Sequence, residues 1–213
     1  SSLKDNTDLN IAVITGCLKV AKESIFTGTN NFVADTIADE RFSSFFGFTD
    51  EEVRTLLENT GNLEYFDRIK KWYDGYCFGK TEIYSPWDVL CYLNKLAFES
   101  ESEPENFWEN TSHNDIIRTF LSCEGMDMTD SFEKLLASET IEVNITENLT
   151  YENLTDSEEN LWSVLYLTGY LTKDIKNPVS GKTKAFLKIP NAEIMDIFRK
   201  SVVRWFDERI AVR

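Results

Sequence analysis

Apolar residues at helical spacing predict three helices in the first half of the chain. Thr49-Asp-Glu-Glu52 is a capping box, in which a threonine and the glutamate three residues later satisfy each other's backbone N–H groups. A second helix is predicted over residues 63–72. A third begins at Pro86, because Ser85 suits the N-cap, proline loses no hydrogen bond at the first helical position, and Asp88 complements the helix dipole. The positions predicted to face the core are Val53, Leu56 and Leu57 in the first helix, Phe66, Ile69 and Trp72 in the second, and Val89, Leu93 and Leu96 in the third.

An apolar run near the N-terminus predicts a strand. Residues 11–15 read Ile-Ala-Val-Ile-Thr and are followed by glycine. Continuous apolar runs of this length are typical of strands buried on both faces of a parallel sheet. Such a strand needs neighbours on both sides, and without them we expect it to pair differently or fray.

The second half has the element order that is typical of a winged-helix module, namely helix, strand, helix, helix, strand, wing, strand. The predicted elements are a helix over residues 132–137, a strand over 140–145, a helical turn over 149–154, a helix over 161–168 opened by a capping box at 155–158, a hairpin of strands 170–174 and 185–189 around 177–181, and an amphipathic helix that begins at the Asn191 cap. The apolar side of that last helix is Ile194, Ile197, Phe198, Val202, Trp205 and Phe206.

These elements predict a mainly α fold with small β elements in three parts. Residues 1–98 form a helical first part, residues 99–130 an acidic linker and a helix, and residues 131–213 the winged-helix-like module with its C-terminal helix. Residues 99–105 are charged, free of apolar side chains and interrupted by proline, as linkers commonly are. Ser112 is predicted to cap the helix that follows.

The net charge of −15 is unevenly distributed. Residues 1–98 carry 10 basic and 15 acidic side chains, residues 99–160 carry 2 and 17, and residues 161–213 carry 10 and 5. The acidic middle part repels nucleic acid, whereas the basic C-terminal part tolerates it. Two interpretations stay open: contact with nucleic acid, or, as we favour, two solvated faces of opposite sign against which neighbouring domains dock.

Cysteine and histidine usage argues against a metal site. The four cysteines, Cys17, Cys77, Cys91 and Cys123, form no C-x-x-C pair, and His113 is the only histidine. Cys17 and Cys91 lie in apolar patterns and are predicted to be buried thiols. No signal peptide and no membrane-length apolar run is present, so we expect a cytoplasmic protein and interpret its four Asn-x-Ser/Thr triplets as coincidental.

Three motifs carry a resemblance to a known family. The segment Lys71-Trp-Tyr-Asp-Gly-Tyr-Cys-Phe-Gly79 followed by Ile83-Tyr-Ser-Pro-Trp-Asp-Val-Leu90 is the most specific, and it is accompanied by Ile14-Thr-Gly-Cys-Leu-Lys-Val-Ala-Lys-Glu-Ser-Ile-Phe-Thr-Gly28 and Phe107-Trp-Glu-Asn-Thr-Ser-His-Asn114. Together, from about Leu3 to Phe206, they resemble the bacterial AAA-ATPase-like family. Members of that family commonly carry a PD-(D/E)XK nuclease-like domain at the C-terminus.

The resemblance begins downstream of the family's phosphate-binding loop. The chain contains no G-x-x-x-x-G-K-[ST] sequence, so it has neither the N–H cradle nor the lysine that hold nucleotide phosphates. It also has no acidic pair with a following Glu-x-Lys of the nuclease type. The resemblance therefore implies the end of an ATPase-like core and its helical lid, with ATP and Mg bound by the full-length protein and no cofactor in this chain.

The resemblance also suggests residues near a nucleotide. Thr15 corresponds to a polar sensor position at the end of a strand, and the alternative is a threonine that satisfies the strand end. Lys19, Lys22 and Glu23 lie just beyond it and either approach the nucleotide or are solvated. No catalytic residue is expected, because His113 has no nucleophile and acidic partner beside it and is predicted to form hydrogen bonds at a helix start.

We predict a mainly structural role for the aromatic motif. Gly75 is expected to supply a backbone geometry closed to other residues, and Asp74 to accept hydrogen bonds in a turn. Aromatic loops of this kind commonly anchor into a core. The motif residues in this group are Trp72, Tyr73, Asp74, Gly75, Tyr76, Pro86 and Trp87.

The charges of the winged-helix-like module argue against base reading. DNA-reading members place a basic helix in the major groove. Here the corresponding helix opens Asp156-Ser-Glu-Glu159 and has no basic residue up to Thr168. Lys176, Lys182 and Lys184 in the wing are the candidates for backbone contact.

The resemblance to the AAA-ATPase-like family implies a sensor and lid portion that couples nucleotide state to an adjacent nuclease-like domain. The alternatives are a winged-helix module that binds nucleic acid or protein without nucleotide, and a structural interaction protein.

Overall fold

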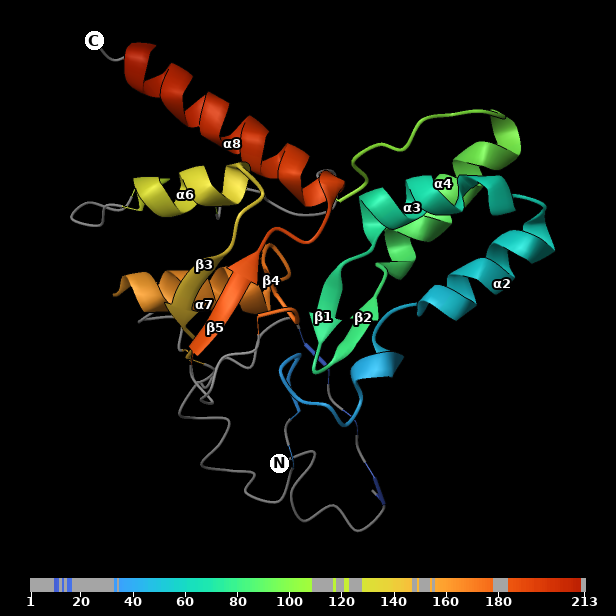
Figure 1. Ribbon diagram of the computed structural model, residues 1–213, viewed down its shortest axis with the longest axis horizontal. Helices are drawn as coiled ribbons and strands as arrows, with labels where there is room; N and C mark the ends of the chain where they lie inside the picture. Colours follow the sequence, from blue (N-terminus) through green and yellow to red (C-terminus); the bar gives the residue numbers. More distant parts are fainter. Residues whose placement is uncertain are drawn as a thin grey trace.

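A computed structural model describes residues 35–108, 128–146, 156–177 and 184–211, together with positions 10, 11, 13, 15, 16, 33, 117, 121, 122, 149 and 154. The fold is mainly helical with small antiparallel sheets, as the sequence predicts (Figure 1). The helices are α2 (Asp50–Thr60), α3 (Phe66–Tyr73), α4 (Pro86–Phe98), α6 (Thr129–Leu136), α7 (Glu158–Leu167) and α8 (Ala192–Ala211), with 3-10 turns at Ser43–Phe45 and Leu63–Tyr65. The strands are β1 (Tyr76–Phe78), β2 (Thr81–Ile83), β3 (Ile141–Asn144), β4 (Thr172–Lys173) and β5 (Lys184–Lys188).

Helices α2, α3 and α4 pack into one hydrophobic cluster. The predicted capping box is present at the start of α2, where Thr49 N donates to Glu52 Oε2 over 2.8 Å and Glu52 N donates to Thr49 Oγ1 over 3.3 Å. Helix α4 begins at Pro86, as predicted. The buried members of this first cluster are Val53, Leu57, Tyr65, Phe66, Ile69, Tyr73, Tyr84, Val89, Tyr92, Leu93 and Leu96.

The second cluster is built on a three-stranded antiparallel sheet of order β3-β5-β4. Ile141 pairs with Leu187 between β3 and β5, and Thr172 pairs with Lys188 between β4 and β5. Helix α7 lies against this sheet and buries six consecutive residues, from Leu161 to Tyr166. Asn191 caps α8, as predicted, because its Oδ1 accepts the N–H of Ile194 over 3.0 Å.

Four sequence-based details are wrong. The described positions of the run at residues 11–15 are not those of a buried strand: Ile11 and Val13 lie outside regular structure and are 78% and 85% exposed, and residues 12 and 14 lie outside the described residues. The second helix begins with a 3-10 turn, so α3 proper starts at Phe66. The cap of α7 is Ser157 rather than Thr155, since the Ser157 hydroxyl accepts the N–H of Asn160. Cys91 is only half-buried, whereas Cys77 is buried and Cys17 lies outside the described residues.

The two clusters lie side by side, with α8 running from one to the other (Figure 1). Helix α3 contacts α8, and β1 contacts β4. The predicted linker at residues 99–105 is irregular but packs on the first cluster: Pro104 is buried, and the Tyr92 hydroxyl donates to the Ser102 carbonyl over 2.6 Å. None of the helices in the described part of the chain combines the length and the apolar character needed to cross a membrane.

Candidate functional site

Four segments that are distant in the sequence meet between the two clusters. They are residues 73–77, 85–88, 105–108 and 190–193, and we call their meeting place the junction. Three of the four belong to motifs that the sequence analysis singles out, and the fourth is the start of α8. The junction is therefore the candidate functional site.

Gly75 lies directly on the backbone that precedes α8. Its φ of +98° is in the left-handed region, which residues with a Cβ rarely adopt. A Cβ built on Gly75 would clash with the carbonyl oxygen of Pro190 and lie 3.1 Å from its carbonyl carbon. Glycine is required here for two reasons at once, the backbone conformation and the close approach.

Asn191 joins the same motif to α8. Its Nδ2 donates to the Asp74 carbonyl over 3.0 Å, while its Oδ1 caps the helix through Ile194 N. Its side chain also forms a hydrogen bond with the hydroxyl of Tyr76. One residue on, Cys77 N donates to Thr172 Oγ1 of β4 over 2.8 Å. The motif is thus bonded to the second cluster at consecutive positions.

Tyr73 links the motif to the first cluster and to the linker. The side chain is fully buried, and its ring lies 6.0 Å from the rings of both Tyr92 and Phe107. Its hydroxyl donates to the Glu105 carbonyl over 2.9 Å, and its backbone carbonyl accepts the N–H of Ser85 over 3.1 Å. Tyr73 therefore holds the end of α3, the start of α4 and the linker in one place.

Residues 105–108 enter the junction between aromatic rings. The Trp108 ring stacks on Tyr170 at a centroid distance of 4.9 Å. The backbone N–H groups of Phe107 and Trp108 both donate to Glu193 Oε1, over 2.7 and 3.0 Å. Glu193 on the first turn of α8 is thus the acceptor that fixes this segment.

Asp88 and Glu193 form a buried carboxyl pair at the centre of the junction. Asp88 is 2% exposed and Glu193 is fully buried, and a hydrogen bond joins their side chains. Burial and the neighbouring Asp88 raise the pKa of Glu193 to about 8, and burial raises the pKa of Asp88. Burial raises the pKa of both carboxyls, so the pair holds a proton at a pH where exposed carboxyls have lost theirs.

A second cluster of polar side chains lies at the edge of the junction and is centred on the ammonium group of Lys70. Lys70 Nζ is 2.7 Å from Asp50 Oδ1 and 3.4 Å from Asp74 Oδ2, and the Tyr84 hydroxyl donates to Asp50 over 2.8 Å. The hydrogen bond from Lys70 is the main cause that lowers the pKa of Asp50 to about 2. Burial raises the pKa of Asp74. Asp74 thus has a structural partner in Lys70, and it also accepts the N–H of Gly75.

Of the predicted nucleotide-proximal residues, the structure describes only Thr15, which is exposed and outside regular structure. Lys19, Lys22 and Glu23 lie outside the described residues. Among the residues that the structure describes, no group of three or more His, Cys, Asp or Glu side chains is placed to hold a metal ion.

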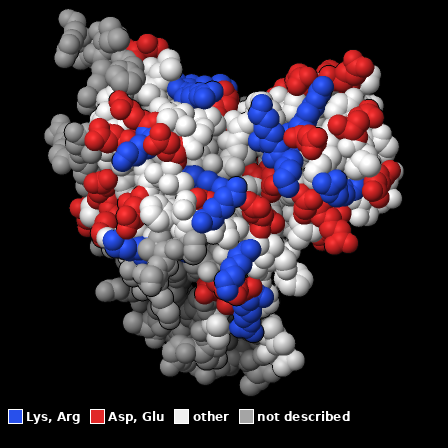
Figure 2. Space-filling model, viewed as in Figure 1, with Lys and Arg blue, Asp and Glu red and all other residues white. Residues whose placement is uncertain are grey.

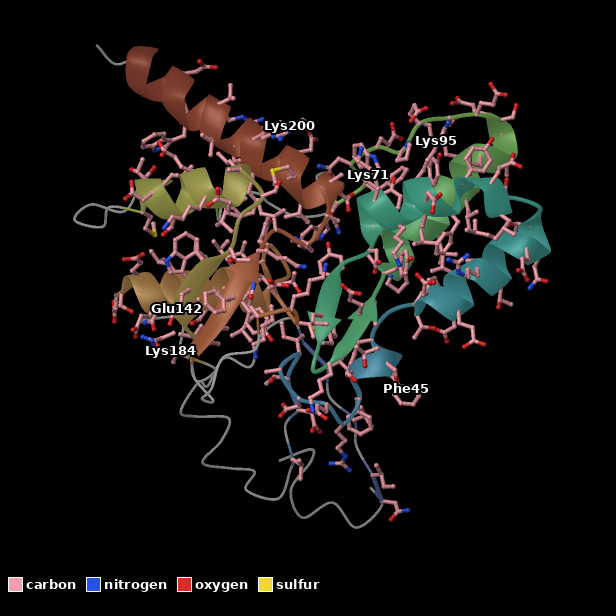
Figure 3. The ribbon with its side chains drawn as sticks, in the orientation of Figure 1. Phe45, Lys71, Lys95, Glu142, Lys184 and Lys200 are labelled. Carbon is pink, nitrogen blue, oxygen red and sulfur yellow. The ribbon has the colours of Figure 1, made fainter. Side chains whose placement is uncertain are left out.

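Three of the remaining candidates, Trp87, Lys176 and Lys184, have exposed positions. Trp87 belongs to the aromatic motif but is 57% exposed, in contrast to Tyr73. Lys184 Nζ lies 2.8 Å from Glu142 Oε1 on the neighbouring strand, and Figure 3 shows the two side chains together at the edge of the sheet. Lys176 is exposed, and Lys182 and His113 lie outside the described residues. Acidic and basic side chains alternate over the visible face of the molecule (Figure 2).

The sequence analysis missed Glu193, and it missed the partners that Asn191 makes outside its own helix. It treats Asn191 only as a helix cap and Asp88 only as a residue that complements a dipole. A signal was present, since Glu193 is an acidic residue immediately before the apolar stripe of α8. Local patterns could not pair Glu193 with Asp88, because Asp88 lies 105 positions earlier in the chain.

The comparisons with known proteins provide one relative. An uncharacterised protein encoded in the vnfD 5′ region of Azotobacter chroococcum mcd 1 is 25% identical over 197 residues, which is 91% of this chain and 34% of that protein. The chain therefore spans about a third of the length of the curated relative it matches. No family model matches the chain, and no solved structure matches it either.

Proposed function

We propose that this chain is the sensor and lid portion of a longer AAA-ATPase-like protein, in which it couples nucleotide state to an adjacent nuclease-like domain. The observation that carries the proposal is the junction. Residues of the family motif connect two hydrophobic clusters to each other, through Gly75 on Pro190 and Asp74 on Asn191. A motif in this position transmits a displacement of one cluster to the other, because packed clusters move as rigid bodies.

The length of the relative supports a longer parent protein. Two-thirds of that protein lies outside the region that matches this chain. The phosphate-binding loop and the nuclease-like domain would lie in such flanking sequence. ATP and Mg would be bound there, and no step of the proposal requires a nucleotide on the described residues.

An exposed apolar stripe on α4 fits contact with a neighbouring domain of that longer protein. Trp87, Leu90 and Phe98 are 57%, 48% and 83% exposed and lie on one side of the helix at spacings of three and eight residues. Phe45, which is 80% exposed, lies apart from this stripe on the 3-10 turn beside β2 (Figure 3). Large apolar side chains gathered on one surface are typical of protein contacts.

The second cluster supports a winged-helix-like module that does not read bases. Its described elements follow the order α6, β3, α7, β4, β5, with the strands in the sheet order β3-β5-β4, and the predicted helical turn over 149–154 and the wing lie largely outside the described residues. However, α7 buries every side chain from Leu161 to Tyr166, so that stretch cannot enter a groove. The nucleic-acid alternative has only the wing lysines, of which Lys184 is paired with Glu142. Protein contact is therefore the role we propose for this module.

Steady-state ATP hydrolysis tests the proposal on this chain. We expect the purified chain to release no phosphate above the buffer background, because its sequence has no phosphate-binding loop. Thr15→Ala and Asp74→Asn should leave that background unchanged. Measurable turnover that either substitution abolishes would contradict the proposal, since the chain would then be an ATPase in its own right. The matching positive control is the same assay on the parent protein.

A further inference from the structure

We propose that Asp88 and Glu193 share a single proton and act as a proton-sensitive latch between α4 and α8. The inference concerns this chain alone and is independent of the proposed coupling to ATP. Neither the helix pattern nor the family resemblance assigns a role to Glu193.

The first step is that the two carboxyl groups cannot both be charged without cost. Asp88 is 2% exposed and Glu193 is fully buried, so neither is solvated by water. With both groups ionised, Asp88 Oδ1 and Glu193 Oε2 have no hydrogen-bond partner. One proton between the groups supplies the missing donor and removes the repulsion between two adjacent anions.

The second step concerns the groups that act most strongly on the pair. Tyr73 and Tyr76 of the motif and Cys91 of α4 act on it as neutral groups, because burial raises the pKa of all three. Ser85 forms a hydrogen bond with Asp88. The backbone N–H groups of Phe107 and Trp108 donate to the Glu193 carboxylate and lower its pKa, and Asn106 Nδ2 donates to the Glu193 carbonyl over 3.3 Å. The largest effect on both carboxyls is burial, which raises both pKa values.

The third step is the position of the pair. Repulsion between the two carboxylates would push apart the start of α4 and the start of α8. Asp88 lies in the first turn of α4 in the first cluster, and Glu193 lies in the first turn of α8 beside the second. Both helix dipoles favour an anion, but burial outweighs them, because the pKa of Glu193 is raised to about 8. When the proton is lost, Glu193 keeps its bonds to Phe107 and Trp108, so the repulsion acts across the contact between α4 and α8.

The sign of the pH effect follows from linkage. Unfolded glutamate ionises near its ordinary pKa of 4.5, whereas folded Glu193 ionises near 8. The stability that the pair contributes is therefore fully present below pH 4.5 and is lost progressively as the pH rises to about 8. Above that pH both states are ionised and the loss levels off.

Urea unfolding from pH 5 to pH 9 tests the latch with wild type and Glu193→Gln. Glutamine keeps the acceptor for Phe107 N and Trp108 N and donates permanently to Asp88, so the variant mimics the protonated state and is expected to fold. We expect the urea midpoint of wild type to fall relative to that of Glu193→Gln from pH 5 to pH 8, and the difference to level off beyond. Parallel profiles for the two proteins would overturn the proposal.

An NMR titration of the same two proteins adds a local readout. The amide signals of Phe107 and Trp108 should shift with a midpoint near pH 8 in wild type and stay constant in Glu193→Gln. The amide of Val53, which bonds to the Thr49 carbonyl in α2, is the internal control and should not titrate. Shifts that persist in Glu193→Gln, or signals that do not titrate in wild type, would assign the proton elsewhere and end the proposal.

Discussion

Replacing Gly75 with valine should lower the free energy of unfolding by about 2–6 kcal/mol. A strained backbone conformation costs on the order of 1–3 kcal/mol. The new side chain also meets the Pro190 carbonyl, and forced overpacking costs about another 1–3 kcal/mol. Domains of this size lose roughly 2–4 °C in melting temperature for each kcal/mol, so a thermal melt should show a decrease of at least about 4 °C.

Gly61 offers a matched control for the backbone part of that effect. It also has a positive φ, of +71°, but a Cβ built on it meets nothing within 4 Å. Gly61→Ala should therefore cost only the backbone contribution, about 1 kcal/mol, and Gly75→Ala should cost clearly more. Asp74→Asn should cost less than either Gly75 variant, because an amide oxygen still accepts a turn hydrogen bond. Unchanged melting of Gly75→Val would contradict a structural role for the motif.

Tyr73→Ala should have a comparable effect through lost packing, about 3–5 kcal/mol in the free energy of unfolding. The ring is fully buried among Tyr92, Phe107 and Trp72, so its removal leaves a cavity. Tyr73→Phe keeps the ring and loses only the hydroxyl that bonds to the Glu105 backbone, and it should cost about 1–2 kcal/mol. Urea unfolding of the two variants separates packing from hydrogen bonding.

Trp87 supplies the control for the aromatic residues of the same motif. Its side chain is 57% exposed, and surface substitutions away from caps and cores usually change stability by less than about 0.5 kcal/mol. Trp87→Ala should therefore melt close to wild type. The interpretation of the junction would fail if Trp87→Ala were as destabilising as Tyr73→Ala.

Local patterns predict the starts of α2 and α8 well, because each of these helices begins with a cap that acts within a few residues. The capping box at Thr49 and the cap at Asn191 are satisfied by neighbours three residues away. The failure at residues 11–15 has the opposite cause. A strand is defined by partners that may lie anywhere in the chain, and the exposed Ile11 and Val13 have no such partners in the described structure.

Contacts between distant parts of the chain also limit what the sequence predicts about the junction. The sequence indicates that residues 71–79 matter and that Gly75 needs a special conformation. It does not indicate what the glycine touches, since Pro190 is 115 residues away. Nor does it pair Asp88 with Glu193, because the raised pKa of Glu193 arises only when two helix starts are brought together. A pKa shift that depends on burial can be recognised only once the folded structure is known.

The central claim is that the junction makes the two clusters one mechanical unit, and native-state hydrogen exchange tests it most directly. Val53 in α2 is fully buried and distant from the second cluster. Val53→Ala should lower the free energy of opening by about 2 kcal/mol. The account predicts that amides of α7 in the second cluster lose the same protection as amides of α4 in the first. Unchanged protection in α7, with the loss confined to α2, α3 and α4, would show that the clusters open independently and would contradict the claim.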